Sequence, residues 1–337
     1  MIKPKIQFDS DISNNENILN KALKLKNVLV IGGAGTIGSN YLKQILKFKP
    51  SKITVVDFNE NGLTELTRDL RSSNLLDYNT EYITYPVNLL SATFDKIFNS
   101  ESWQVVANFS AHKHVRSEKD KISVEALIKN NVYGAIKLLN LCEKNSPNYF
   151  FSVSTDKAAN PVNIMGASKS LMEKLILSKK HRFRVSTARF ANVAFSNGSL
   201  LDGFIQRLNK KQPLSCPSDI KRFFVSPKQS GQICLLATFL GHSGNIFFPK
   251  LDFHKDQIYF KDIALDFLKE NGFEPELVKS EKEAKEFDFD SNPSKYPIYF
   301  FKTDTSGEKT YEEFYTEEED YEINRYDSLG FVNTQDI

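Results

Sequence analysis

The stretch Val28-Leu29-Val30-Ile31-Gly32-Gly33-Ala34-Gly35-Thr36-Ile37-Gly38 decides the fold of this chain. An apolar run stands directly before a glycine-rich turn, and an amphipathic segment follows. This is the order of a buried strand, a tight turn and a helix. Glycines let such a turn come close to a bound pyrophosphate, and the amides of the helix N-terminus attract its negative charge. The pattern therefore predicts a dinucleotide-binding turn whose contacts come from Gly32, Gly35, Thr36, Ile37 and Gly38.

An acidic residue at the end of the next apolar run indicates which dinucleotide binds. Asp57 stands nineteen residues after Gly38, a spacing at which a carboxylate can bind the ribose 2′-hydroxyl. The same carboxylate would repel a 2′-phosphate, and no arginine follows it directly, so the sequence predicts NAD rather than NADP. After the third run, Asn88 stands where a side chain usually reaches the adenine, although it suits a helix cap equally well.

Strand and helix patterns alternate from Lys26 onward. The apolar runs that we predict as strands lie at 27–31, 52–57, 81–87, 104–109, 149–154 and 184–190. The amphipathic segments that we predict as helices lie at 37–48, 62–72, 124–143 and 167–179. Runs that are apolar on both faces are typical of parallel strands covered by helices on each side. We therefore predict an α/β protein, with a Rossmann-like doubly wound parallel sheet and a smaller C-terminal substrate lobe.

Glycine and proline residues set the expected domain boundaries, because they become frequent after Phe190. Residues 1–25 are predicted to form an N-terminal arm that ends in a short helix. The NAD-binding domain is expected to comprise residues 26–190 and about 229–255. The substrate-binding lobe is expected to comprise about 191–228 and 256–337.

Composition limits the classes of partner and compartment. The formal net charge of +2 argues against a general nucleic-acid binder, which normally carries a strongly basic face. The three cysteines are isolated and suit a reducing compartment. Because there is neither a signal-peptide core nor an apolar run long enough to span a bilayer, we expect a soluble cytoplasmic protein with no membrane partner. His112 and His114 have no carboxylate or cysteine partner, so we predict pocket lining and no metal site.

A second informative stretch is the sequence STDKAANPVNIMGASKSLMEK at 154–174. It closely resembles the nucleotide-sugar 4,6-dehydratases of polysaccharide biosynthesis, and more narrowly the soluble catalytic half of the membrane-anchored UDP-N-acetylglucosamine 4,6-dehydratases. Further motifs resemble those of that family, in the same order, from about residue 4 to about residue 319. They are SAHKHV at 110–115, RFANV at 189–193, SNGS at 196–199, DIKRFF at 219–224, GEK at 307–309 and EE at 312–313.

The resemblance implies an enzyme of the extended short-chain dehydrogenase/reductase class that holds NAD tightly and forms a homo-oligomer. Such a dehydratase oxidises the C4 hydroxyl of the sugar, removes the C5 proton, expels the C6 hydroxyl and returns the hydride to C6. The product is a 4-keto-6-deoxy sugar for cell-surface glycans. The nucleotide sugar implied is a UDP-sugar, UDP-N-acetylglucosamine above all.

The types of residue in the second stretch suit this chemistry. Lys157 is expected to be the base for C5, with a pKa lowered by burial beside the positive nicotinamide ring and Lys169. Asp156 would protonate the departing C6 oxygen within an enclosed pocket. Thr155 would hold the C4 oxygen, and Lys169 would bind the nicotinamide ribose. Without the glycine turn, the same residues could be a strand end with a solvated acid–lysine pair.

Met165 completes the predicted catalytic set and distinguishes the reaction. The wider class has a tyrosine here, which takes the hydroxyl proton during oxidation, and a thioether cannot act as a base. A plain dehydrogenase or a simple C4 epimerase is therefore disfavoured. The same methionine occurs in the dehydratases that the chain resembles, which implies retention of configuration at C5. A nucleotide-sugar C4 or C5 epimerase and a non-catalytic NAD-binding scaffold stay as alternatives.

Departures from the family pattern leave the sugar open. Arg116 replaces a common proline, Ile31 replaces a frequent threonine, and the segment 117–120 also differs. Arg222 is a candidate for the diphosphate, because a guanidinium binds phosphate oxygens in a bidentate manner. Helix caps and surface ion pairs are the structural alternatives for such residues. The substrate-binding residues that we predict are Lys113, His114, Asn192, Ser199, Arg222 and Glu308.

Overall fold

The structure, a computed structural model, describes residues 6–76, 78–114, 118–178, 181–253, 255–303 and 312–334. The chain divides into two compact units. The larger unit contains Ile6–Phe190, Lys228–Lys250 and the segment that begins at Glu313. The smaller unit contains Ala191–Pro227 and Leu251–Glu312.

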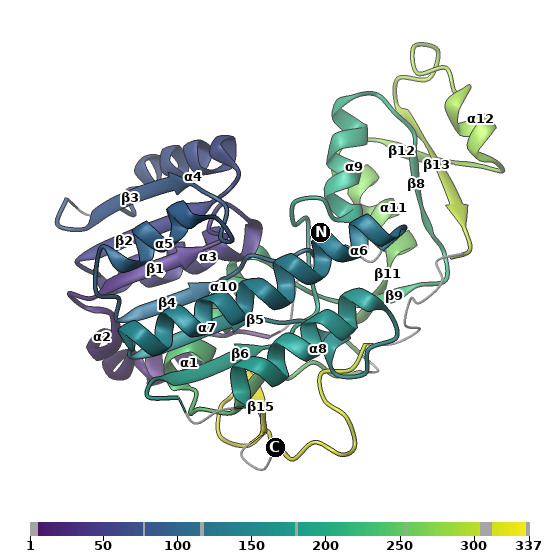
Figure 1. Cartoon of the computed structure of the whole chain (residues 1–337). Helices are drawn as coiled ribbons and strands as arrows, with labels where there is room; N and C mark the ends of the chain where they lie inside the picture. The colour runs from purple at the N-terminus through teal and green to yellow at the C-terminus, as the bar shows by residue number, and fades with distance from the viewer. Residues whose placement is uncertain are drawn as a thin grey trace. The chain divides into compact units, whose positions relative to one another are not determined.

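A mostly parallel sheet forms the centre of the larger unit (Figure 1). Its strands are β1 (Asn27–Ile31), β2 (Lys52–Asp57), β3 (Glu81–Pro86), β4 (Val105–Asn108), β5 (Tyr149–Val153), β6 (Arg184–Ala188), β10 (Asn245–Pro249), β14 (Tyr321–Glu322) and β15 (Leu329–Asn333). Over the described ranges, these nine strands follow the order β14-β15-β10-β6-β5-β4-β1-β2-β3. Strand β15 is antiparallel to both β10 and β14, and the other pairs are parallel. The predicted Rossmann-like α/β class is confirmed.

Helices connect these strands and cover both faces of the sheet. They are α1 (Asp9–Asn14), α2 (Glu16–Leu23), α3 (Thr36–Ile45), η1 (Leu46–Phe48), α4 (Glu60–Ser72), α5 (Ala92–Asn99), α6 (Lys121–Ile128), η3 (Lys129–Tyr133), α7 (Gly134–Asn145), η4 (Asp156–Ala158), α8 (Ile164–Leu177) and α10 (Pro227–Leu240). Among the described residues, none of these helices is both long enough and apolar enough to cross a membrane.

The main apolar core lies between the sheet and helices α5, α7 and α8. The central strands contribute branched side chains such as Leu29 and Val106, which are fully buried and sit opposite each other in the parallel register. Helices α7 and α8 contribute Leu138 and Met172 to the same cluster. Each Å² of apolar surface removed from water contributes about 25 cal/mol to the free energy of folding. This cluster therefore stabilises the packing of α5, α7 and α8 on the sheet.

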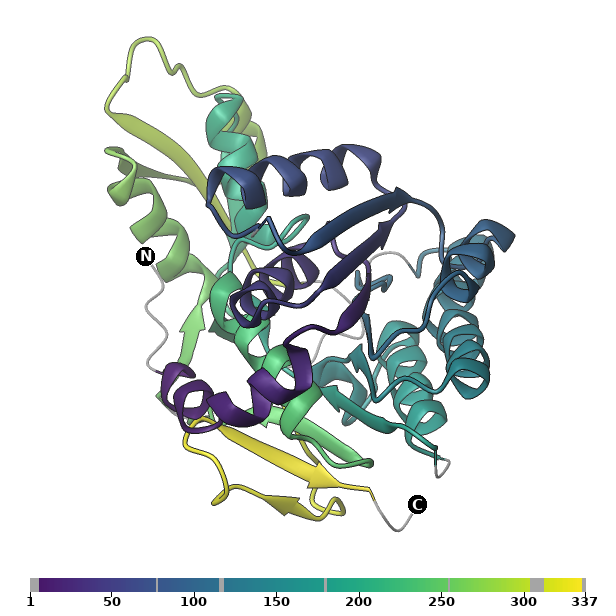
Figure 2. The same ribbon diagram turned by 90° about the vertical axis from the view of Figure 1, so that its left-hand side faces the viewer.

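The two ends of the larger unit lie side by side. Figure 2 shows the purple N-terminal helices next to the yellow C-terminal strands. The buried carboxylate of Asp11 in α1 accepts hydrogen bonds from the backbone amides of Asp327, at 2.9 Å, and Ser328, at 2.8 Å. The N-terminal segment from Ile6 belongs to the larger unit, and its Asp11 satisfies backbone amides of the bend before β15.

The structure also differs from the predicted lobe boundary at the C-terminus. The prediction gave all of 256–337 to the substrate lobe, whereas the segment from Glu313 belongs to the larger unit. Strand β15 pairs with β10 from Asn245↔Asn333 to Pro249↔Leu329, so it extends the large sheet. The pairing is antiparallel and joins residues far apart in sequence, which no local pattern reveals.

Two small sheets form the smaller unit around a core of their own. Its elements are β7 (Asn192–Val193), α9 (Leu200–Asn209), β8 (Leu214–Pro217), β9 (Lys221–Val225), β11 (Gln257–Tyr259), α11 (Phe260–Glu270), β12 (Glu274–Val278), α12 (Glu281–Lys285) and β13 (Lys295–Phe301). Strands β11, β9 and β7 form one sheet, and β12, β13 and β8 form the other. The core includes Phe204, Leu214 and Leu268, which are almost completely buried.

Candidate active site

The glycine turn between β1 and α3 is closely packed. Gly32 has a φ of +75°, and a Cβ there would lie 2.5 Å from the backbone nitrogen of Ser110. A Cβ at Gly38 would lie 2.4 Å from the carbonyl oxygen of Gly32. At Gly35, which precedes the first residue of α3, the nearest atom would be 3.5 Å away. Neighbouring atoms thus leave no space beside Gly32 and Gly38, whereas a pyrophosphate could approach the start of the helix beside Gly35.

Asp57 connects the end of β2 to this turn. Its Oδ2 accepts a hydrogen bond from the amide of Ala34 at 3.0 Å, and its Oδ1 accepts one from the amide of Asn59 at 3.0 Å. The carboxylate is nearly buried, and its hydrogen bond with the amide of Ala34 holds its charge against the glycine turn. Asn88 is exposed, and its Oδ1 accepts a hydrogen bond from the amide of Leu90 at 2.8 Å. Asn88 therefore stabilises the turn after β3, whereas the cap of helix α5 is Ser91, so the helix-cap alternative for Asn88 is wrong.

Three consecutive side chains after β5 form a hydrogen-bonded cluster. The hydroxyl of Thr155 donates to Oδ1 of Asp156 at 2.7 Å. The amine of Lys157 lies 3.2 Å from Oδ1 and 3.3 Å from Oδ2 of the same carboxylate. Asp156 is 2% exposed, whereas the Lys157 side chain is 27% exposed. An acid and an amine are thus in direct contact, with the carboxylate enclosed and the amine partly open.

Helix α8 packs directly on this cluster. Asn163 caps the helix by accepting a hydrogen bond from the amide of Gly166 at 2.7 Å. A Cβ at Gly166 would lie 2.6 Å from the carbonyl oxygen of Lys157, so only glycine permits this contact. Met165, at the start of the helix, is 2% exposed. The structure therefore brings the first turn of α8 to the predicted catalytic segment.

Lys169 lies one turn further along α8 and is buried. Its amine donates a hydrogen bond to the carbonyl oxygen of Val153 at 2.6 Å, at the end of β5. Burial lowers the pKa of Lys169 to about 8, and the negative charge of Glu173 opposes that shift. A buried amine with a pKa near neutrality can change protonation during a reaction, so such groups are candidates for functional sites.

Two residues that the sequence analysis missed hold the loop after β4 against this site. Asn131 is buried in the π-helical segment η3, and its side chain bonds both the amide and the carbonyl of His112, at 2.8 and 3.0 Å. It also reaches the hydroxyl of Ser168 at 3.0 Å. Glu118 accepts a hydrogen bond from the amide of Met165 at 3.2 Å. A polar residue within the apolar stripe of a predicted helix was the available signal for Asn131.

Two predicted substrate-binding residues of the smaller unit converge on one buried carboxylate. Glu312 accepts a hydrogen bond from the Asn192 amide group at 2.5 Å and one from the backbone of Phe223 at 2.7 Å. The Nε of Arg222 lies 3.7 Å from Glu312. Ser199 caps helix α9 by accepting from the amide of Asp202 at 3.1 Å. The sequence analysis gave Glu312 no role of its own, because its contacts come from distant strands.

The other predicted substrate residues are less informative. Lys113 and His114 are exposed on the loop after β4. Glu308 lies outside the described residues, as do Arg116 and Ser117. Within the described ranges, no group of three or more His, Cys, Asp and Glu side chains could hold a metal ion.

The sequence matches the family model described as polysaccharide biosynthesis protein over residues 28–334. It is 29% identical to an uncharacterized membrane protein, MJ1061, of Methanocaldococcus jannaschii, over 92% of this chain and 86% of that protein. It is 30% identical to a UDP-N-acetylglucosamine 4,6-dehydratase (inverting) of Campylobacter jejuni, over 67% of each chain. The similarity to the probable polysaccharide biosynthesis protein EpsC of Bacillus subtilis, at 28% identity, covers 83% of this chain but 45% of EpsC.

A solved structure, Pen from Bacillus thuringiensis, shares the fold with a TM-score of 0.74 and 23% identity, covering 93% of this chain and 89% of that one. The chain thus belongs to the polysaccharide biosynthesis protein family, and its resemblance to nucleotide-sugar 4,6-dehydratases of the extended short-chain dehydrogenase/reductase class is confirmed.

Proposed function

We propose that this protein catalyses the NAD-dependent 4,6-dehydration of a UDP-linked amino sugar, with UDP-N-acetylglucosamine as the first candidate. The contact between Asp156 and Lys157 at the end of β5, beside a helix that carries Met165 and Lys169, supports this proposal most directly. The Campylobacter relatives that carry the name of this reaction support the choice of sugar.

The glycine turn and the site around β5 fit a nicotinamide dinucleotide. The packed backbone of the turn, with space only beside Gly35, is suited to a pyrophosphate at the N-terminus of α3. Asp57 would bind the adenosine ribose, and Lys169 would bind the nicotinamide ribose. When bound, NAD would supply the acceptor for the C4 hydride and the donor of the same hydride to C6.

The Asp156–Lys157 pair can supply the acid and the base together. As an ion pair, the two groups hold one proton on the amine. The amine, which is partly exposed, can release that proton to solvent, and the carboxylate can then take the proton of the C4 hydroxyl through Thr155. The amine can then remove the C5 proton, and the acid can protonate the C6 oxygen as it leaves as water.

Thr155 and Met165 define the remaining contacts. The hydroxyl of Thr155 donates to Asp156, so it can relay the proton of the C4 hydroxyl to that carboxylate during oxidation. Met165 is buried and offers no titratable group, so it serves as an apolar wall. This division of roles explains how the reaction would proceed without a tyrosine at this position.

Isotope labelling tests the proposal sharply. The purified protein is incubated with UDP-N-acetylglucosamine in deuterated water, and the product is analysed by mass spectrometry and NMR. We expect loss of one water, one solvent deuterium at C5, and transfer of deuterium from a C4-labelled substrate to C6. The configuration at C5 distinguishes retention from the inversion named for the Campylobacter relatives.

Other outcomes would overturn the proposal. An isomer of unchanged mass, with the C4 label still at C4, would identify an epimerase, the reaction named for relatives from Rickettsia. Tight NAD binding without turnover of any UDP-, GDP- or dTDP-sugar would identify a non-catalytic scaffold.

A further inference from the structure

A buried charge network joins helix α8 to the end of β6 and to the C-terminal segment of the larger unit. Arg189, just after β6, forms a bidentate ion pair with Glu173 of α8, with distances of 3.0, 3.1 and 2.7 Å. Its other edge binds Glu319 at 2.9 and 2.8 Å and the carbonyl oxygen of Phe314 at 3.0 Å. Arg189 and Glu173 are each 3% exposed. One cation therefore holds two carboxylates, which leaves the network with one surplus negative charge.

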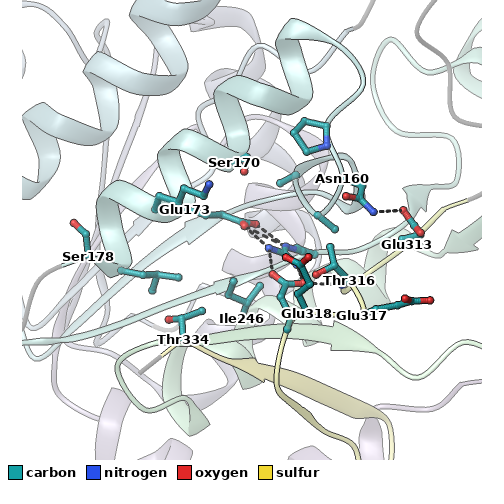
Figure 3. A pocket seen from close by; sticks show the side chains of 17 residues that line it. Asn160, Ser170, Glu173, Ser178, Ile246, Glu313, Thr316, Glu317, Glu318 and Thr334 are labelled. Carbon is teal, nitrogen blue, oxygen red and sulfur yellow. Dashed lines mark hydrogen bonds and ion pairs between the residues drawn. The ribbon is translucent and has the colours of Figure 1, made fainter. Parts of the chain in front are cut away.

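Figure 3 shows this network in the wall of a cavity of about 710 Å³ between α8 and the C-terminal segment. Glu173 points from the helix toward the guanidinium, and Glu318 and Glu317 stand on the opposite wall. The loop that directly follows the catalytic segment closes one side, where Asn160 donates a hydrogen bond to Glu313 at 3.1 Å. The network thus contacts helix α8, and its cavity is also lined by the loop after η4. Both elements belong to the candidate active site.

Glu173 is placed to act on Lys169. The two residues are four positions apart on α8, so their side chains lie on the same face of the helix. Lys169 reaches the end of β5, and Glu173 reaches the end of β6, the neighbouring strand. Both are buried, so their charges interact with little solvent screening. Arg189 fixes the position of the carboxylate, and Glu319 cancels the positive charge that Arg189 would otherwise add.

We propose that Glu173 is a positioning residue whose charge, fixed by Arg189 and Glu319, favours the protonated amine of Lys169. The amine can then donate its hydrogen bonds to the end of β5 and to a bound ribose. The inference rests on the proposed function only in taking Lys169 as a cofactor-binding residue. The pKa of Lys169 agrees with it, because burial lowers the value and Glu173 raises it.

Other ionisable groups lie on the elements packed against α8. They are Asp156 and Lys157 on η4, Lys129 and Tyr133 on η3, Lys121 and Glu125 on α6, Lys137, Cys142, Glu143 and Lys144 on α7, and Arg184 on β6. Glu173 is the carboxylate that lies one helical turn from Lys169 on α8 and is fixed there by its buried ion pair with Arg189. Its removal is therefore the direct test.

The experiment follows the protonation of Lys169 in the full chain by NMR of the protein labelled with carbon-13 at the lysine Cε. The Lys169 signal is identified by its loss in Lys169→Met. We expect its titration midpoint to fall by on the order of one pH unit in Glu173→Gln. Glu319→Gln should cause a smaller decrease, because Glu319 contacts the other edge of the guanidinium. Glu281→Gln, which removes a carboxylate from an exposed pair on α12, is the matched control and should cause no change.

An unchanged or higher midpoint in both Glu173→Gln and Glu319→Gln would overturn the proposal. Glu319 is partly exposed, so its variant provides the answer even if Glu173→Gln does not fold. The pH profile of turnover provides a second readout, in which the alkaline limb should move to lower pH by the same amount. Because the NMR titration needs no substrate, failure of the dehydratase assignment and failure of this inference can be told apart.

Discussion

The contact between Asp156 and Lys157 is the chemical centre of the candidate site. Neighbours in sequence on an extended strand would point to opposite faces, but these two residues begin the short helix η4, which lets both side chains meet. Thr155 caps that helix and bonds the same carboxylate. The contact between the acid and the amine therefore depends on the local turn of η4, which brings the two neighbouring side chains together.

Replacement of Lys157 tests the predicted base. In Lys157→Ala we expect kcat to fall by roughly 10²–10⁴-fold while NAD still binds, because general-base catalysis contributes that much. Steady-state kinetics and NAD titration by fluorescence measure the two effects. Lys285→Ala removes a lysine from an exposed helical pair and should leave turnover unchanged. Undiminished activity in Lys157→Ala would contradict the assignment.

Lys169 predicts a specific dependence of stability on pH. Its pKa is about 8 in the folded protein and about 10.5 when unfolded, so between these values the unfolded chain binds more protons. The free energy of unfolding therefore rises with pH in that window, by at most about 1.4 kcal/mol per pH unit from this group. Lys169→Met should lack this slope. Urea unfolding of both proteins from pH 7.5 to 9.5, roughly the accessible part of the window, compares them; parallel slopes would refute the expectation.

At Gly32 and Gly38 the turn between β1 and α3 has no space for a side chain, because backbone atoms lie against both glycines. At Gly38 a methyl group would press on the carbonyl of Gly32, whereas at Gly203 in helix α9 nothing lies within 4 Å. The two glycines are both helical, so they differ mainly in their surroundings. This contrast separates the packing requirement of the turn from the ordinary cost of glycine in a helix.

Alanine substitution at these two positions should have opposite effects. Gly38→Ala is expected to lower the free energy of unfolding by roughly 1–3 kcal/mol through overpacking, and to weaken NAD binding. Gly203→Ala should raise the free energy of unfolding by about 0.5–1 kcal/mol, because alanine loses less backbone entropy. Thermal and urea unfolding, with NAD titration, measure these changes. Equal effects at both sites would show that the turn is not tightly packed.

The two units of the chain each bury free cysteines. Cys142 and Cys234 lie in the larger unit and Cys216 lies in the smaller one, and all three are fully buried. Burial raises the pKa of each thiol, that of Cys216 to about 12. Thiols in such surroundings are protonated at neutral pH and unreactive.

Cysteine labelling can therefore report the opening of each unit. In the native protein at pH 8 we expect all three thiols to resist alkylation. In increasing urea Cys216 should react first, because a smaller unit buries a smaller fraction of its surface. Mass spectrometry of labelled peptides identifies the order. Simultaneous labelling of all three would show that the units unfold as one.

Local sequence signals were enough for strands β1 to β6 of the parallel sheet and for the glycine turn, but not for the parallel strand β10. The strands at 27–31 and 52–57 are continuous apolar runs, and the turn contains glycines at the required spacing, so each feature depends on neighbouring residues. The predicted segment at 154–157 and the helix that follows it were recognisable for the same reason.

Tertiary structure decided the features that join distant segments. Strand β15 extends the large sheet, Glu312 gathers Asn192 and Arg222, and Arg189 ties β6 to α8 and to the C-terminal segment. Each of these contacts spans more than a helical turn or a hairpin, so periodicity and spacing do not reveal it. A buried charge needs a partner wherever the fold provides one, and only the folded chain shows which residue that partner is.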